Sequence, residues 1–98
     1  QDAQIFSPND LKIYSPKLLC IEITMTVATG EKGQIFYTGL SDTGFQEKNS
    51  KEFKIIADGK PNSYKVCLYP KTLINQLRID PTNKPGEFKI NRLEIIHE

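Results

Sequence analysis

Apolar and polar residues alternate along most of this chain with a period of two. The clearest run is residues 21–27, where Ile, Ile, Met and Val alternate with Glu, Thr and Thr. Successive side chains of a β-strand point to opposite faces, so the apolar residues of such a run share one face of a sheet. The β-branched threonines suit a strand better than a helix. Residues 21–27 are therefore predicted to form a strand with one buried face.

Similar runs recur at a spacing of about ten residues, with turns rich in Gly, Pro and Asn between them. The further predicted strands are residues 34–40, 53–55, 64–68, 77–80 and 88–95. The last run changes parity at Asn91 and Arg92, as one extra residue in a β-bulge would produce. The one candidate helix is residues 70–76, at most one or two turns long.

This pattern predicts an all-β chain that forms a two-layer antiparallel β-sandwich of seven or eight strands. The 98 residues are interpreted as a single domain, with residues 1–9 as a loose lead-in or an edge strand. The predicted core consists of Ile21, Ile23, Met25, Val27, Ile35, Phe53, Ile55, Val66, Leu68, Leu77, Ile79, Ile90 and Ile95.

The balance of charge excludes two classes of partner. Thirteen basic and twelve acidic residues leave a net charge of +1. Nucleic acids and anionic membranes are bound by concentrated positive fields, so neither is expected here. No apolar run approaches the ~20 residues that span a bilayer, so no direct membrane insertion is expected.

The two cysteines, Cys20 and Cys67, lie 47 positions apart, and the spacing matches no compact metal motif. On the predicted strands both fall on the polar parity, with no sign that they face each other. Two free thiols are therefore expected, with a disulfide as the alternative. Free thiols favour the cytoplasm, or the cytoplasmic face of a membrane, over secretion.

Catalytic chemistry finds little support in the sequence. The single histidine, His97, lies one residue from the end of the sequence, where a catalytic triad or dyad would rest on a fraying segment. Glu22, Glu47 and Glu52 are interpreted as solvated acids. Asp42, Asp58 and Asp80 occur singly, without the dense acidic spacing of a calcium loop. We expect no enzymatic activity, no cofactor and no metal.

Aromatic residues offer the better handle for a ligand. If Ile35 and Tyr37 face the core, then Phe36 points outward, and Phe45 lies in a polar loop. Sugar rings present apolar C–H faces that stack on such side chains. The alternative interpretation is packing: Phe36 in a second contact layer and Phe45 at an open end of the sandwich.

Arg78 and Asp80 share the outward face of one predicted strand, two positions apart. The pair is interpreted first as a structural tie between the strand and the turn that follows it. Any ligand site is expected on the strand 34–37 and the loop 45–47, rather than on the polar face of residues 21–27. The candidate ligand-binding residues are Gln34, Phe36, Tyr37, Phe45, Glu47 and Arg78.

The ordered set of residues 34–37, 44–47, 64–66 and 77–90 carries a family resemblance. It resembles small jelly-roll-like, carbohydrate-binding-type β-sandwich modules appended to bacterial glycosyltransferases and cell-surface polysaccharide proteins. The stretch Leu-Arg-Ile-Asp-Pro at 77–81, with its Pro-Gly turn at 85–86, is the most specific part.

The resemblance implies a non-catalytic accessory domain that binds or orients an oligosaccharide, or that packs against a neighbouring catalytic domain. It implies the fold more firmly than the function, because one sandwich supports many ligands. The alternative is a structural or protein-interaction domain of the same fold without a sugar ligand.

Overall fold

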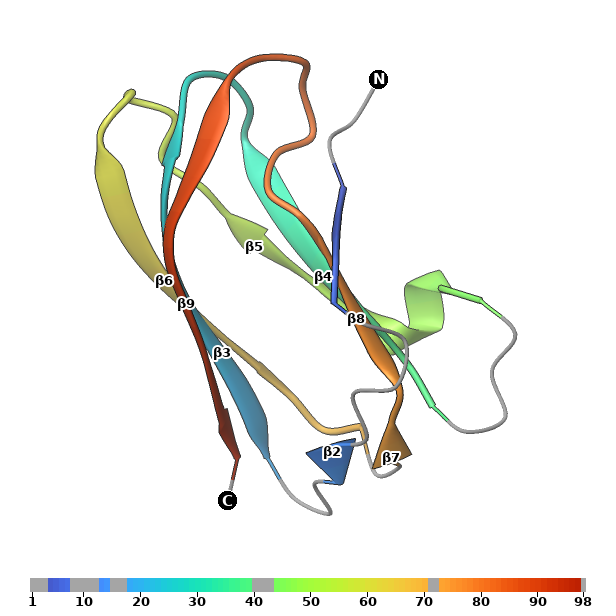
Figure 1. Ribbon diagram of the computed structural model, residues 1–98. Coiled ribbons are helices and arrows are strands. Elements are labelled where there is room, and N and C mark those ends of the chain that lie inside the picture. Colours follow the sequence, from blue (N-terminus) through green and yellow to red (C-terminus); the bar gives the residue numbers. More distant parts are fainter. Residues whose placement is uncertain (1–3, 8–12, 15–17, 40–43, 71–72, 98) are drawn as a thin grey trace.

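The computed structural model describes residues 4–7, 13–14, 18–39, 44–70 and 73–97. Its strands are β1 (Ile5–Phe6), β2 (Ile13–Tyr14), β3 (Leu19–Val27), β4 (Lys32–Thr38), β5 (Ser50–Lys54), β6 (Pro61–Leu68), β7 (Leu73–Ile74), β8 (Gln76–Asp80) and β9 (Phe88–His97). They form a four-stranded sheet in the order β1-β8-β4-β5, a three-stranded sheet in the order β6-β3-β9, and the small pair β2-β7. All strand pairs are antiparallel. The two larger sheets lie in separate layers (Figure 1).

The six strands predicted by range correspond to β3, β4, β5, β6, β8 and β9, apart from their ends. The two large sheets together contain seven strands, as expected, but the pair β2-β7 brings the described strands to nine, more than the seven or eight predicted. In β9 the register shifts opposite Thr24 and Met25, which face Arg92 and Ile90, so Asn91 is the extra residue of the predicted bulge. The predicted helix over residues 70–76 is wrong where the chain is described, because residues 73–74 and 76 are strand. Residues 71–72 and 40 lie outside the described residues. Of the lead-in, Ile5–Phe6 forms an edge strand.

The core lies between the two large sheets. Every residue of the predicted core is buried there or packs against its buried members. Leu19 and Ile74 also belong to this cluster and are fully buried, although the alternation did not single them out. Alternate residues of β3 point into it, and their neighbours on the strand form the outer face of the sheet. A core shared by two sheets makes the fold sandwich-like.

The chain passes between the sheets at one end of the molecule. Residues 28–31 lead from β3 to β4, and residues 81–87 lead from β8 to β9 (Figure 1). Thr82 is buried and its Oγ1 donates to the carbonyl of Thr29 at 2.6 Å. In return, the Thr29 hydroxyl donates to the carbonyl of Pro85 at 2.6 Å. We call this contact between residues 28–32 and 81–87 the crossover clamp.

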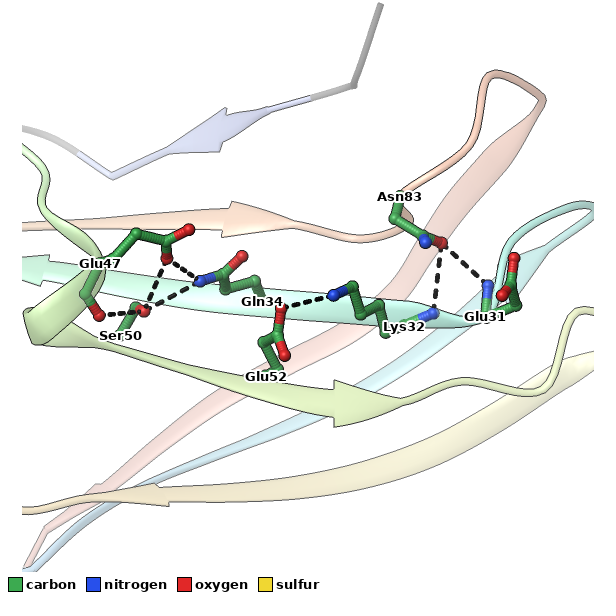
Figure 2. A network of polar contacts seen from close by, with 7 residues as sticks. All are labelled: Glu31, Lys32, Gln34, Glu47, Ser50, Glu52 and Asn83. Carbon is green, nitrogen blue, oxygen red and sulfur yellow. Dashed lines mark hydrogen bonds and ion pairs between the residues drawn. The ribbon is translucent and has the colours of Figure 1, made fainter.

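Asn83 completes the crossover clamp. Its Oδ1 accepts from the backbone N–H groups of Glu31 at 2.9 Å and Lys32 at 3.3 Å (Figure 2). Gly30 has a φ of +123°, and a Cβ there would lie 1.9 Å from Thr82 Oγ1. Only glycine fits both the backbone conformation and the close approach. The motif around residues 77–86 is thus explained in large part by a structural junction.

The cysteine prediction is wrong, because Cys20 and Cys67 form a disulfide. Their assignment to the polar parity is right, since both lie on the outer face of the three-stranded sheet. The register of β3 and β6, however, places them directly opposite each other with Cα atoms 4.0 Å apart. Parity along one strand carries no information about the partner strand. The expectation of a reducing compartment loses its premise.

Replacing both cysteines by serine should lower the free energy of unfolding by roughly 2–4 kcal/mol, because the bond restricts the unfolded chain. Urea unfolding of the oxidised protein and of the C20S/C67S variant measures the difference. Adding a reductant should shift the midpoint of the oxidised protein only. Equal midpoints for both proteins without reductant would contradict the contribution of this bond.

Replacing Asn83 by alanine should lower the stability by about 1–2 kcal/mol, because two backbone N–H groups lose their acceptor. The matched control is Lys84→Ala, whose ammonium lies 3.5 Å from Glu31 on an exposed surface. That change should stay within about 0.5 kcal/mol of the parent protein. Equal unfolding midpoints for the two variants would exclude Asn83 as a structural clamp residue.

Candidate functional site

The outer face of the four-stranded sheet brings together most of the candidate residues. Phe36 of β4 faces Arg78 of β8, which also faces Phe6 of β1. Gln34 of β4 faces Asp80 of β8. Because side chains alternate along each strand, these five side chains share the face directed away from the core. Residues 44–49 follow the far end of β4 and return to β5 beside this face (Figure 1).

Arg78 lies at the centre of this face and covers Phe36. Its guanidinium carbon is 3.9 Å from the centre of the Phe36 ring, and only 5% of Phe36 is exposed. Arg78 also binds Asp80 through two contacts of 3.0 Å, from Nε to Oδ1 and from Nη2 to Oδ2. The paired bonds hold the guanidinium group over the ring. The predicted pairing of Arg78 with Asp80 is therefore present, with both residues on β8.

Phe45 extends the aromatic surface beyond Phe36. Its ring centre lies 6.4 Å from that of Phe36 and 5.8 Å from that of Phe6, within the usual range for aromatic pairs. It also lies 5.4 Å from the Arg78 guanidinium carbon. Phe6 itself is 51% exposed. We call Phe6, Phe36, Phe45 and Arg78 the aromatic patch.

A polar network adjoins the aromatic patch along β4 (Figure 2). The amide nitrogen of Gln34 donates to Glu47 Oε2 and, at 2.9 Å, to Ser50 Oγ. The Ser50 hydroxyl donates to the carbonyl of Glu47 at 2.7 Å. Glu47 begins the short 3₁₀ helix Glu47–Asn49. The network fixes Gln34 and Glu47 beside each other, and it ties the loop that carries Phe45 to the sheet.

Lys32 lies on the same face of β4 as Gln34 and Phe36, at the end of the strand that is further from Phe36. Its ammonium lies 2.7 Å from Glu52 Oε2, and this hydrogen bond, with the charge of Glu52, raises the pKa of Lys32 above its ordinary value. Both side chains are about half exposed, so the pair adds little stability. A small hollow of about 40 Å³ lies between Lys32, Gln34 and Asp80. That volume suits a water molecule or two.

The structure therefore gathers five of the six candidate residues and separates the sixth. Gln34, Phe36, Phe45, Glu47 and Arg78 lie along one face or at its border. Tyr37 has the opposite parity on β4 and packs against the core. Phe36 fills a second contact layer, as one of the two interpretations expected. Phe45 packs on the outer face of the sheet instead of plugging an open end.

Sequence reasoning missed Phe6, the most exposed member of the aromatic patch. The available signal was the pair Ile5–Phe6, an apolar step in which one residue must face outward if the other is buried. The two residues form only a short strand, and the partner β8 comes more than seventy positions later. The pairing that places Phe6 over Arg78 is a tertiary contact.

A second hollow lies on the polar face of β3, where no ligand site was expected. Its volume is about 260 Å³, and its lining includes Glu22, Thr24, Ser63, Lys65 and Arg92. It offers hydrogen-bond donors and acceptors and charges of both signs. Its lining also includes the aromatic residue Tyr64, which packs against the core. Within the described residues, no three His, Cys, Asp or Glu side chains gather in a way that could hold a metal ion. Nor does any described helix have the length and hydropathy of a membrane crossing.

Comparison with protein-family models, curated proteins and solved structures gave no match. The argument for a function therefore rests on the chain's own residues.

Replacing Phe36 by alanine should cost about 3 kcal/mol of stability, because the change opens a cavity under Arg78. The matched control is Phe6→Ala on the same face, where the ring is half exposed and the loss should stay below about 1 kcal/mol. Urea unfolding of both variants measures the difference. Equal losses would show that Phe36 is not a packing residue.

Proposed function

We propose that this domain is a non-catalytic module that binds a glycan on the outer face of its four-stranded sheet. The observation that carries the proposal is the position of Phe6 and Phe45, whose adjacent rings border the Arg78–Asp80 pair. Apolar rings next to fixed planar polar groups form the combination that a sugar requires.

The rings supply the affinity. Stacking a sugar's C–H face on one exposed ring buries apolar surface worth ~25 cal/mol per Å², or about 1–2 kcal/mol in total. Association itself costs at least ~4 kcal/mol, so a single sugar should bind only in the millimolar range. A longer oligosaccharide that reaches Gln34 and Glu47 gains further contacts. The nearly neutral charge of the chain suits a neutral sugar.

The polar groups supply the specificity. Arg78 carries five N–H donors, of which two serve Asp80 among the described contacts, so others remain for sugar hydroxyls. Gln34 uses its amide nitrogen within the network, which leaves its carbonyl oxygen as an acceptor. Because these groups are already held by Asp80, Glu47 and Ser50, little side-chain entropy is lost when a ligand binds.

The setting that fits this role is an accessory domain of a larger protein that handles polysaccharides. The disulfide between Cys20 and Cys67 supports an oxidising compartment over the cytoplasm. In this arrangement the domain holds or orients a glycan while a neighbouring domain acts on it.

One observation favours the alternative of a structural or protein-interaction domain. Phe36 and Tyr37, two of the three aromatic candidates, serve packing and not an open surface. Phe45 and Phe6 are then the residues that separate the two functions.

The glycan proposal is tested by following backbone amide shifts during titration with neutral and acidic oligosaccharides. Shifts should cluster at residues 6, 45–47 and 78, with a dissociation constant near the millimolar range. The F6A/F45A variant should lose at least ~tenfold in affinity, equivalent to the ~1.4 kcal/mol expected from the lost rings. The matched control is Tyr69→Ala, which removes an aromatic ring that is exposed outside the patch.

Two results would overturn the proposal. Shifts confined to residues 22–26 and 63–65 would assign binding to the hollow on the other sheet. The absence of shifts at ~100 mM sugar, where a millimolar site is nearly saturated, would leave the domain without a glycan site. Thermal unfolding of each variant confirms that the fold is intact.

A further inference from the structure

The four edges of the two large sheets differ in how well they are protected. β1 has two residues, and three of the five residues of β5 are charged. β6 begins at Pro61, and contacts from β5 and the residues after it close that side of the molecule: Lys51 Nζ donates to the carbonyl of Cys67, and the Ile56 N–H donates to Tyr64 Oη. Short strands, charges, prolines and coverage are the usual means by which proteins prevent pairing at sheet edges.

β9 has weaker protection. It has ten residues, and within the described structure it pairs with β3 on one side only. Its bulge at Asn91 interrupts the first part of the strand, but residues 92–97 continue without proline or glycine. Leu93 is 43% exposed, although Ile23, which lies opposite it on β3, is buried. A long, regular edge with an exposed apolar residue is a site for pairing with another strand.

An apolar cleft accompanies this edge. It lies between β1 and β9, has a volume of about 200 Å³, and is lined by Ile5, Leu77, Ile79, Ile90, Leu93 and Ile95. The contacts described above close the β5 and β6 side, whereas in the described part of the chain this cleft opens between β1 and β9. A strand added to β9 would lie along the mouth of this cleft.

The charges next to Leu93 identify the occupant as a second copy. Arg92 and Glu94 lie on the outer face, on either side of Leu93, and bind each other at 3.2 Å. When two copies of β9 pair antiparallel about a two-fold axis at Leu93, each residue faces a residue of the other copy. The two facing residues lie equally far from Leu93, one before it in sequence and the other after it. Leu93 then faces its own copy, and Arg92 of each chain faces Glu94 of the partner subunit. The segment 92–94 is therefore complementary to itself.

The sheet itself adds to this argument. Within the chain, Glu94 faces Glu22 of β3, and like charges directly opposite are unfavourable. A cation on the free side of Glu94 would offset that repulsion, and the partner subunit's Arg92 is placed to supply it. Two leucines at the axis would also bury surface that each chain exposes alone.

We propose that the chain forms a two-fold dimer by antiparallel pairing of β9 with β9 of a second copy, centred on Leu93. The pairing joins the two three-stranded sheets into one continuous sheet of six strands. The pairing edge and the aromatic patch belong to different sheets, although Phe6 of the patch also lines the cleft beside β9. The contact is small, so the dimer should be weak, with a dissociation constant on the order of 100 µM.

The test is sedimentation of the whole chain from ~10 µM to ~1 mM, a range that spans the expected dissociation constant. The parent protein should pass from monomer to dimer. In the dimer, position 92 of each chain faces position 94 of the other, which gives two such pairs. Either single variant, Arg92→Glu or Glu94→Arg, gives both pairs like charges, so each should weaken the dimer by roughly tenfold or more. The double variant R92E/E94R should recover the dimer, because both pairs are again of opposite sign.

The mixture of the two single variants gives the sharpest result. A chain with Arg92→Glu carries two acids on this edge, and a chain with Glu94→Arg carries two bases, so the two chains should pair with each other better than with themselves. The matched control is Lys54→Glu, which makes the same change of charge on β5 at the edge of the other sheet, opposite Lys32, and should leave the dimer unchanged. Amide spectra of each variant confirm its fold.

A parent protein that stays monomeric up to ~1 mM would overturn the proposal. A dimer that is unaffected by both single variants, or a mixture no stronger than its components, would exclude pairing about Leu93. Neither result depends on whether the aromatic patch binds a glycan.

Discussion

The crossover clamp is the constraint on which the rest of the structure depends. The chain changes sheets at residues 28–31 and again at 81–87, and these two connections are joined by Thr29, Thr82 and Asn83. Fixing both connections sets where β4 begins and where β8 ends relative to β3 and β9. The register of β4 against β8 follows, and with it the contact of Phe36 with Arg78. A local set of hydrogen bonds at one end of the sandwich thereby positions a surface on its outer face.

Each sheet has a distinct outer surface. The four-stranded sheet carries aromatic rings around a central arginine, whereas the three-stranded sheet carries a disulfide, threonines and mixed charges. Phe36 belongs to the packing beneath Arg78, and only Phe6 and Phe45 extend that layer toward solvent. The unprotected edge at β9 belongs to the other sheet. A ligand on one sheet and a second chain at the edge of the other can therefore be accommodated together.

The disulfide shows what the analysis of single strands leaves out. Alternation correctly assigned Cys20 and Cys67 to outward faces of their strands, yet it led to the prediction of free thiols. Two residues on the same outer face become partners only if their strands are neighbours in a matching register. The neighbours of β3 are β6 and β9, which lie about 40 and 70 positions further along the chain, and β4, the next strand in sequence, belongs to the other sheet.

The sequence by itself determined the all-β class, the faces of the main strands, the core and the bulge at Asn91, because each depends on the alternation of neighbouring residues. It also singled out five of the residues that lie along the outer face of the four-stranded sheet or at its border. Only the tertiary structure decided that Arg78 covers Phe36, that Phe6 joins Phe45 and that the cysteines are bonded. The physical reason is that strand order and register join residues far apart in the chain, and no local pattern encodes which strands become neighbours.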